Sequence, residues 1–135
     1  MGMATDPIRV TGAVIVRNGA VMAAQRGAHK SQGGLWEFPG GKIESGETPQ
    51  DALARELREE LSCSVSVGEK LTTTAHDYGT AVVELTTFFC TLEGTEPQLS
   101  EHQALAWLPP ERLEELACAP ADVPAVRLLV EGARL

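Results

Sequence analysis

The chain has 135 residues, a mass of 14.4 kDa and a formal net charge of −8 at pH 7. This length predicts one domain over residues 1–135, and the 43% share of hydrophobic residues argues against a disordered chain. The acidic charge argues against binding to nucleic-acid polymers. The sequence has neither a long apolar run nor a signal peptide. We therefore expect a cytoplasmic protein without a membrane partner.

The first part of the sequence predicts a β-hairpin followed by a long loop. Residues 8–17 are mostly apolar and β-branched, Asn18-Gly19 is a strong two-residue turn signal, and residues 21–26 continue apolar. The glycine-rich stretch 27–46 contains one short apolar piece, 35–38, and is expected to be mainly loop. A long ordered loop usually has a function.

A helix is predicted from Pro49 to Leu61. Thr48-Pro49-Gln50-Asp51 has the form of a capping box with proline at the first helical position. The apolar stripe that follows predicts one buried face, formed by Ala52, Leu53, Leu57 and Leu61.

The rest of the chain predicts strands and then two short helices. Strand-like segments lie at 64–67, 70–76, 80–91 and 104–108. Pro109-Pro110 before residues 111–116 indicates a short helix, and residues 123–134 indicate a second one after Pro120. The order of strands, helix, strands and helix predicts a mixed α/β or α+β domain.

Three glutamates gather on one face of the predicted 49–61 helix. Glu56, Glu59 and Glu60 are spaced i, i+3 and i+4, and each like-charged pair at i,i+4 destabilises a helix by about a few tenths of a kcal/mol. A cation between them would remove this cost, and magnesium suits such oxygen ligands best. The ordinary alternative is a solvated acidic face with an Arg55 to Glu59 ion pair.

The segment 41–63 resembles the Nudix box, Gx5Ex7REUxEExGU with U an aliphatic residue. The matching letters are Gly41-Lys-Ile-Glu-Ser-Gly-Glu47, seven residues, and then Arg55-Glu56-Leu57-Arg58-Glu59-Glu60-Leu61-Ser62-Cys63. Ser62 departs from the pattern, since the family has glycine there as a helix C-cap. A left-handed backbone costs a residue with a side chain roughly 1 kcal/mol. Cys63 serves as a small apolar substitute at the final U position.

The resemblance implies the Nudix fold, a mixed β-sheet sandwiched between α-helices with the box as a loop–helix–loop. It implies hydrolysis of a nucleoside triphosphate to the monophosphate and pyrophosphate, by attack of water on phosphorus with Mg²⁺, for which Mn²⁺ can substitute. Arg55 would orient the carboxylates. The implied metal ligands are Glu56, Glu59, Glu60, the carbonyl of Gly40, and Glu47 through water.

The resemblance extends beyond the box and is nearest to the MutT type of the family. Ala24-Gln25-Arg26 and the stretch Trp36-Glu37-Phe38-Pro39-Gly40-Gly41-Lys42 both match that type. Glu101 falls where the MutT type has a further glutamate that acts as metal ligand or general base. Without this resemblance, Glu101 would be interpreted as an ordinary surface glutamate. The implied substrate-binding residues are Arg26, Glu37, Phe38, Lys42 and Asp122. The spacing of the three histidines is not that of a zinc site, so surface or hydrogen-bonding roles are expected for them. They are His29, His76 and His102.

The choice of base depends on Asp122. The MutT type reads 8-oxo-dGTP with an asparagine in a proline-flanked segment, and here Ala119-Pro120-Ala121-Asp122-Val123-Pro124 has aspartate. An ionised aspartate offers acceptors only, so it suits the cytosine amine and repels guanine O6 unless it is protonated. The segments 101–105 and 119–122 also resemble the CTP pyrophosphohydrolase branch. Asp122 could equally be an N-cap for the last helix.

Two other functions remain open at this point. One is a non-catalytic Nudix module that binds a ligand, although such modules often lose the box glutamates that this chain keeps. The other is hydrolysis of a different nucleoside diphosphate derivative. A single chain does not reveal partner surfaces, so both a monomer and a homodimer are compatible with the sequence.

Overall fold

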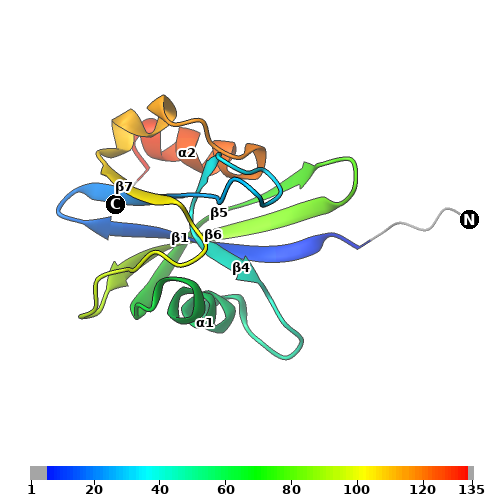
Figure 1. Cartoon of the computed structure of the whole chain (residues 1–135), viewed down its shortest axis with the longest axis horizontal. Coiled ribbons are helices and arrows are strands. Elements are labelled where there is room, and N and C mark those ends of the chain that lie inside the picture. Colours follow the sequence, from blue (N-terminus) through cyan, green and yellow to red (C-terminus); the bar gives the residue numbers. More distant parts are fainter. Residues whose placement is uncertain (1–5, 134–135) are drawn as a thin grey trace, which may run out of the picture.

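The computed structural model describes residues 6–133, which are arranged around one seven-stranded sheet (Figure 1). The strands run in the order β3-β2-β1-β6-β5, with β4 paired to β1 and β7 paired to β2. The elements in chain order are β1 (Ile8–Arg17), β2 (Ala20–Gln25), β3 (Trp36–Glu37), β4 (Gly40–Lys42), α1 (Pro49–Leu61), β5 (Val65–Asp77), β6 (Val82–Leu92), β7 (Ala104–Leu108), the 3-10 helices η1 (Pro110–Glu115) and η2 (Pro120–Asp122), and α2 (Val123–Val130).

The central strand β1 divides the core into two layers. It lies parallel to β6 and antiparallel to β2 and β4, so the sheet is mixed as expected. Because successive side chains of a strand point to opposite faces, Ala13 and Ile15 pack with α1, while Val14 packs with α2. Figure 1 shows α1 and α2 on opposite sides of the strands. The expected sheet between helices is therefore confirmed.

Helix α1 has the predicted bounds, Pro49 to Leu61. The hydroxyl of Thr48 accepts a hydrogen bond from the Asp51 amide at 3.0 Å, which satisfies one free donor at the helix start. The predicted apolar stripe is fully buried. Ser62 ends the helix with φ 53° and ψ 35°, so it adopts the left-handed cap for which the family uses glycine.

Other elements differ from the sequence prediction. The stretch 27–46 is not only loop, because it contributes β3 and β4 to the sheet. The predicted strands 64–67 and 70–76 form one strand, β5, with register shifts near Lys70. The predicted helix 111–116 is the 3-10 helix η1, and α2 ends at Val130. The end of the predicted 123–134 helix lies outside the described residues. Within 6–133, no helix combines the length and the apolar character needed to cross a membrane.

Candidate active site

The site begins where α1 packs closely against β4 and β1. A Cβ atom on Gly40 would lie 2.0 Å from the carbonyl oxygen of Thr11. A Cβ atom on Gly41 would lie 2.3 Å from the carboxyl carbon of Glu56. Only glycine fits at Gly40, where the neighbour is backbone, whereas a Cβ on Gly41 would push the flexible Glu56 carboxylate aside. Gly40 therefore lets β4 lie close to β1, and Gly41 lets the Glu56 carboxylate lie directly against β4.

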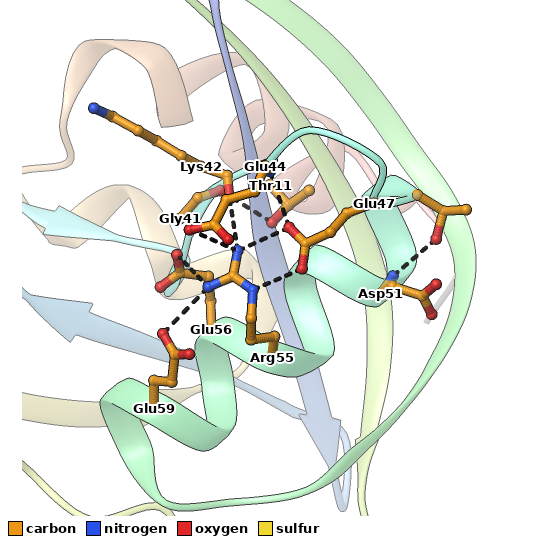
Figure 2. A network of polar contacts seen from close by, with 10 residues as sticks. Thr11, Gly41, Lys42, Glu44, Glu47, Asp51, Arg55, Glu56 and Glu59 are labelled. Atoms are coloured by element: carbon orange, nitrogen blue, oxygen red, sulfur yellow. Dashed lines mark hydrogen bonds and ion pairs between the residues drawn. The ribbon is translucent and has the colours of Figure 1, made fainter.

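Arg55 is the centre of the carboxylate cluster, as Figure 2 shows. Its Nε and Nη2 donate to the two carboxylate oxygens of Glu47 at 2.6 and 2.9 Å. Its Nη1 donates to Glu56 and to Glu59, each at 3.2 Å, and Nη2 also donates to the Lys42 carbonyl at 3.1 Å. A planar guanidinium can orient several carboxylates in this way, whereas a lysine ammonium could not match the fork.

This network sets the charge of Glu47. The hydrogen bond from Arg55 lowers the pKa of Glu47 to about 2, and the Glu44 amide, which donates to the same carboxylate at 2.9 Å, adds to the effect. In return, the carboxylates raise the pKa of Arg55. Glu47 is therefore held ionised beside the box helix, although Arg55 occupies both of its oxygens.

Glu60 differs from the other box glutamates. Its Oε1 is buried and has no hydrogen-bond partner within the part of the chain that the structure describes. Burial raises the pKa of Glu60 to about 7; His102 opposes this shift, and the charges of Glu56 and Glu37 add to it. Burial also raises the pKa of Glu56. A buried oxygen without a partner costs free energy, so it is suited to receive a hard cation.

The box residues thus offer oxygen ligands that suit a divalent cation. Their side chains, however, do not converge on one point in this structure. Among residues 6–133, no three carboxylate, imidazole or thiol groups converge closely enough to hold an ion. Arg55 explains this, because its Nη1 lies between Glu56 and Glu59 and draws both carboxylates to itself. The carboxylate of Glu59 is 60% exposed and remains free to turn.

Two cavities are lined by one of the box glutamates, Glu60. The larger, about 410 Å³, also includes Gly40, Gly41 and Asp122 in its lining, and the smaller is about 150 Å³. Arg26, Glu37 and Glu60 line both cavities, so the two are neighbours. The smaller cavity is completed by Gly27, Lys30, Glu101 and His102.

Other candidate residues take up different places around these cavities. Glu101 lies in the smaller cavity, where it forms an ion pair with Lys30 that lowers its pKa. Phe38 is only 4% exposed and packs in the α2 layer of the core, so little of its ring is free to stack on a base. Lys42 lines the larger cavity, and Figure 2 shows its side chain extending away from the carboxylates.

Asp122 also lines the larger cavity. It is 5% exposed, and its Oδ1 accepts a hydrogen bond from the Phe38 amide at 3.0 Å. It stands at the N-cap position of α2, as the ordinary interpretation expected, but its side chain makes no capping hydrogen bond. Burial raises the pKa of Asp122 to about 8. The neighbouring Ala121 amide donates to the Tyr78 hydroxyl at 3.0 Å, which ties this part of the lining to β5.

Sequence reasoning missed the place of His102. Its side chain is 5% exposed, and Nε2 lies 2.9 Å from Oε2 of Glu37. Oε1 of Glu37 in turn accepts from Nη1 of Arg26 at 2.8 Å. The one available signal was that His102 directly follows Glu101, a candidate site residue. Its burial depends on packing that one sequence does not reveal.

Comparisons with known proteins agree with this geometry. The family described as NUDIX domain matches residues 6–129. A CTP pyrophosphohydrolase of Escherichia coli K12 is 41% identical over 117 residues, which cover 87% of this chain and 87% of that protein. A putative 8-oxo-dGTP diphosphatase 2 of Mycobacterium tuberculosis CDC 1551 is 40% identical over 120 residues, covering 87% and 83% of the two chains. The solution structure of a MutT DNA mismatch repair protein from methicillin-resistant Staphylococcus aureus 252 is 44% identical, covers 96% of this chain and 100% of that chain, and superposes with a TM-score of 0.78.

The family match spans both helix layers and the sheet, and it includes the box whose glutamates and glycines build the site. Divalent metals are the general cofactors of this family, and the unpartnered oxygen of Glu60 agrees with that chemistry. The chain therefore belongs to the Nudix hydrolase family.

Proposed function

We propose that this chain hydrolyses a nucleoside triphosphate to the monophosphate and pyrophosphate with Mg²⁺, and that its substrate is (d)CTP or 8-oxo-dGTP. The observation that carries the proposal is the larger cavity, whose lining includes both the buried Asp122 and Glu60 of α1. A base at Asp122 would direct its phosphates toward Glu60. The names of the two relatives, a CTP pyrophosphohydrolase and an 8-oxo-dGTP diphosphatase, support the same substrates.

The metal would be held by the box. We infer that Glu56, Glu59, Glu60 and the Gly40 carbonyl would hold it, with Glu47 acting through water and Glu101 as a further ligand. Bound Mg²⁺ would lower the pKa of a water molecule and neutralise charge on the phosphate oxygens. Arg55 keeps the carboxylates oriented, and Arg26, which lines both cavities, supplies positive charge along the path of the phosphates.

We infer that Asp122 reads the base as a neutral acid. Because burial raises its pKa to about 8, the protonated carboxyl is the main form at pH 7. A protonated carboxyl offers a donor as well as an acceptor, whereas an ionised one offers acceptors only. The charge argument against guanine O6 therefore no longer applies at neutral pH, and both cytosine and 8-oxoguanine fit the same residue.

A substrate panel tests the proposal. Purified protein with Mg²⁺ is given CTP, dCTP, 5-methyl-dCTP, dGTP and 8-oxo-dGTP, and pyrophosphate release is measured as kcat/KM. We expect release from a cytidine triphosphate or from 8-oxo-dGTP. Release of neither pyrophosphate nor phosphate from any of these nucleotides would refute the proposed function.

The pH dependence of the panel tests the role of Asp122. As the pH rises through about 8, its carboxyl ionises and begins to repel guanine O6, so the preference should move toward the cytidine substrates. In the Asp122→Asn variant the side chain keeps a donor and an acceptor at every pH, so the ratio of the two kcat/KM values should stay constant. A ratio that changes equally in both proteins would exclude Asp122 as the base reader.

A further inference from the structure

We propose that His102 is a positioning residue, which through Glu37 orients the Arg26 guanidinium toward the phosphates of the substrate. The proposal rests on the proposed function, because it assumes that a nucleotide extends its phosphates past Arg26. The three side chains come from separate parts of the chain. Arg26 follows β2, Glu37 ends β3, and His102 precedes β7.

The three side chains form a directed chain of hydrogen bonds. Glu37 presents one oxygen to each neighbour, with Oε2 lying 2.9 Å from Nε2 of His102 and Oε1 lying 2.8 Å from Nη1 of Arg26. An ionised carboxylate accepts only, so Nε2 of His102 carries the proton and donates it. This fixes the tautomer of His102 and the direction of both oxygens of Glu37.

Arg26 is held from two directions by these contacts. Its Nε donates to the Ser31 carbonyl at 2.7 Å, while Glu37 holds Nη1. Arg26 lines both cavities, so the residue held in this way borders the space that we propose for the nucleotide. An arginine that is already oriented loses less side-chain entropy when it binds a phosphate.

The burial of His102 and Glu37 argues against a purely structural role for their hydrogen bond. The side chains of His102 and Glu37 are 5% and 16% exposed, and burying a carboxylate and an imidazole brings little net stability because desolvation opposes their hydrogen bond. Nδ1 of His102 is also buried, and within residues 6–133 it has no hydrogen-bond partner. It therefore adds a cost that apolar packing would avoid. The placement of this polar chain beside Glu60 is better explained by its effect on Arg26.

The backbone around His102 is anchored without its side chain. The amide of Gln103 donates to the Gln25 carbonyl at 2.9 Å, and Nε2 of Gln103 donates to the Arg26 carbonyl at 2.9 Å. A change at His102 therefore removes the contact to Glu37 while these two hydrogen bonds still hold the segment. Gln103→Leu offers a comparison, because it removes a hydrogen bond to the Arg26 carbonyl without touching Glu37 and so separates a looser Arg26 backbone from the loss of the Glu37 contact.

The experiment compares wild type with His102→Leu, His102→Gln and Gln103→Leu. KM and kcat are measured with CTP and 8-oxo-dGTP, and the Kd of α,β-methylene CTP is measured by calorimetry, which needs no turnover. We expect His102→Leu to raise KM and Kd about tenfold with a smaller change in kcat, as the loss of an oriented charge-assisted contact predicts. His102→Gln keeps an N–H donor at a similar reach and should restore most of the affinity. Gln103→Leu, which keeps the contact between His102 and Glu37, should lose clearly less affinity than His102→Leu.

A double-mutant cycle tests whether His102 acts on substrate binding through Arg26. If His102 acts through Arg26, then His102→Leu should cost no further affinity in an Arg26→Ala background. Additive losses, or equal losses in Gln103→Leu, would overturn the proposal. If His102→Leu does not fold, His102→Asn, whose amide falls short of Glu37, takes its place. If wild type binds α,β-methylene CTP but releases no pyrophosphate, the proposed function is refuted. The role of His102 is still decided in that case, because the Kd values of the variants can be compared.

Discussion

Replacing Asp122 by asparagine should change how the stability of the protein depends on pH. The carboxyl is 5% exposed, and its pKa is raised from 3.8 to about 8, chiefly by burial. Between these two values the folded protein holds a proton that the unfolded chain has released. Folding therefore becomes less favourable as pH rises through this window. The slope is at most about 1.4 kcal/mol per pH unit, so roughly 3 kcal/mol is the upper limit from pH 5 to pH 7.

Urea unfolding of both proteins at pH 5, 6, 7 and 8 measures this effect. The side chain of the D122N variant can still accept the Phe38 hydrogen bond, but it has no proton to lose. The free energy of unfolding of D122N relative to wild type should therefore rise with pH. Glu37 and Arg26 act on this carboxyl, and Tyr78 and Cys118 lie near it, but all four are present in both proteins. A difference that is constant from pH 5 to pH 8 would refute a neutral Asp122.

Three further substitutions have effects that follow from the structure. Ser62→Gly should raise the free energy of unfolding by up to about 1 kcal/mol, measured in urea, because Ser62 has φ 53°. Arg55→Lys should lower kcat/KM about a hundredfold in the nucleotide assay, because an ammonium cannot hold both oxygens of Glu47 and also reach Glu56. Gly41→Ala should lower kcat by at least about tenfold with little change in circular dichroism, because its Cβ would displace the Glu56 carboxylate.

The predictions for Gly41 and Arg55 each have a control in the same chain. Gly68→Ala places a Cβ 3.2 Å from the Phe89 carbonyl, outside both cavities, and should leave kcat unchanged. Arg112 forms an exposed ion pair with Glu115, so Arg112→Lys should leave kcat/KM unchanged. Equal losses in Arg55→Lys and Arg112→Lys, or a Ser62→Gly protein less stable than wild type, would contradict the reasoning.

The sequence predicted correctly those elements that are formed by interactions between residues close together in the chain. Helix α1 has the predicted bounds, because the Thr48 cap and the apolar stripe both act within a few turns. The Asn18-Gly19 turn with φ of 53° and 78° likewise follows from the residues themselves. The box letters predicted the family, and the family match over residues 6–129 confirms it.

The missed features depend on contacts between distant residues. Strand β4 has three residues in a glycine-rich stretch, and it exists because it pairs with β1. The two strands expected near residues 64–76 are one, since pairing with β6 continues past the register shifts at Lys70. The burial of Asp122 and His102 arises from packing around residues 37 and 38, which no local pattern records.

We propose that Glu60 and the neighbouring α1 carboxylates, beside the cavity that Asp122 also lines, hold Mg²⁺ for nucleotide hydrolysis. The most direct test measures pyrophosphate release from CTP and 8-oxo-dGTP for wild type, Glu60→Gln and the exposed control Glu114→Gln, with Mg²⁺ and with excess EDTA. We predict that wild type and Glu114→Gln are active only with Mg²⁺, and that Glu60→Gln loses at least about a hundredfold in kcat. Full activity of Glu60→Gln, or of wild type in EDTA, would contradict the claim.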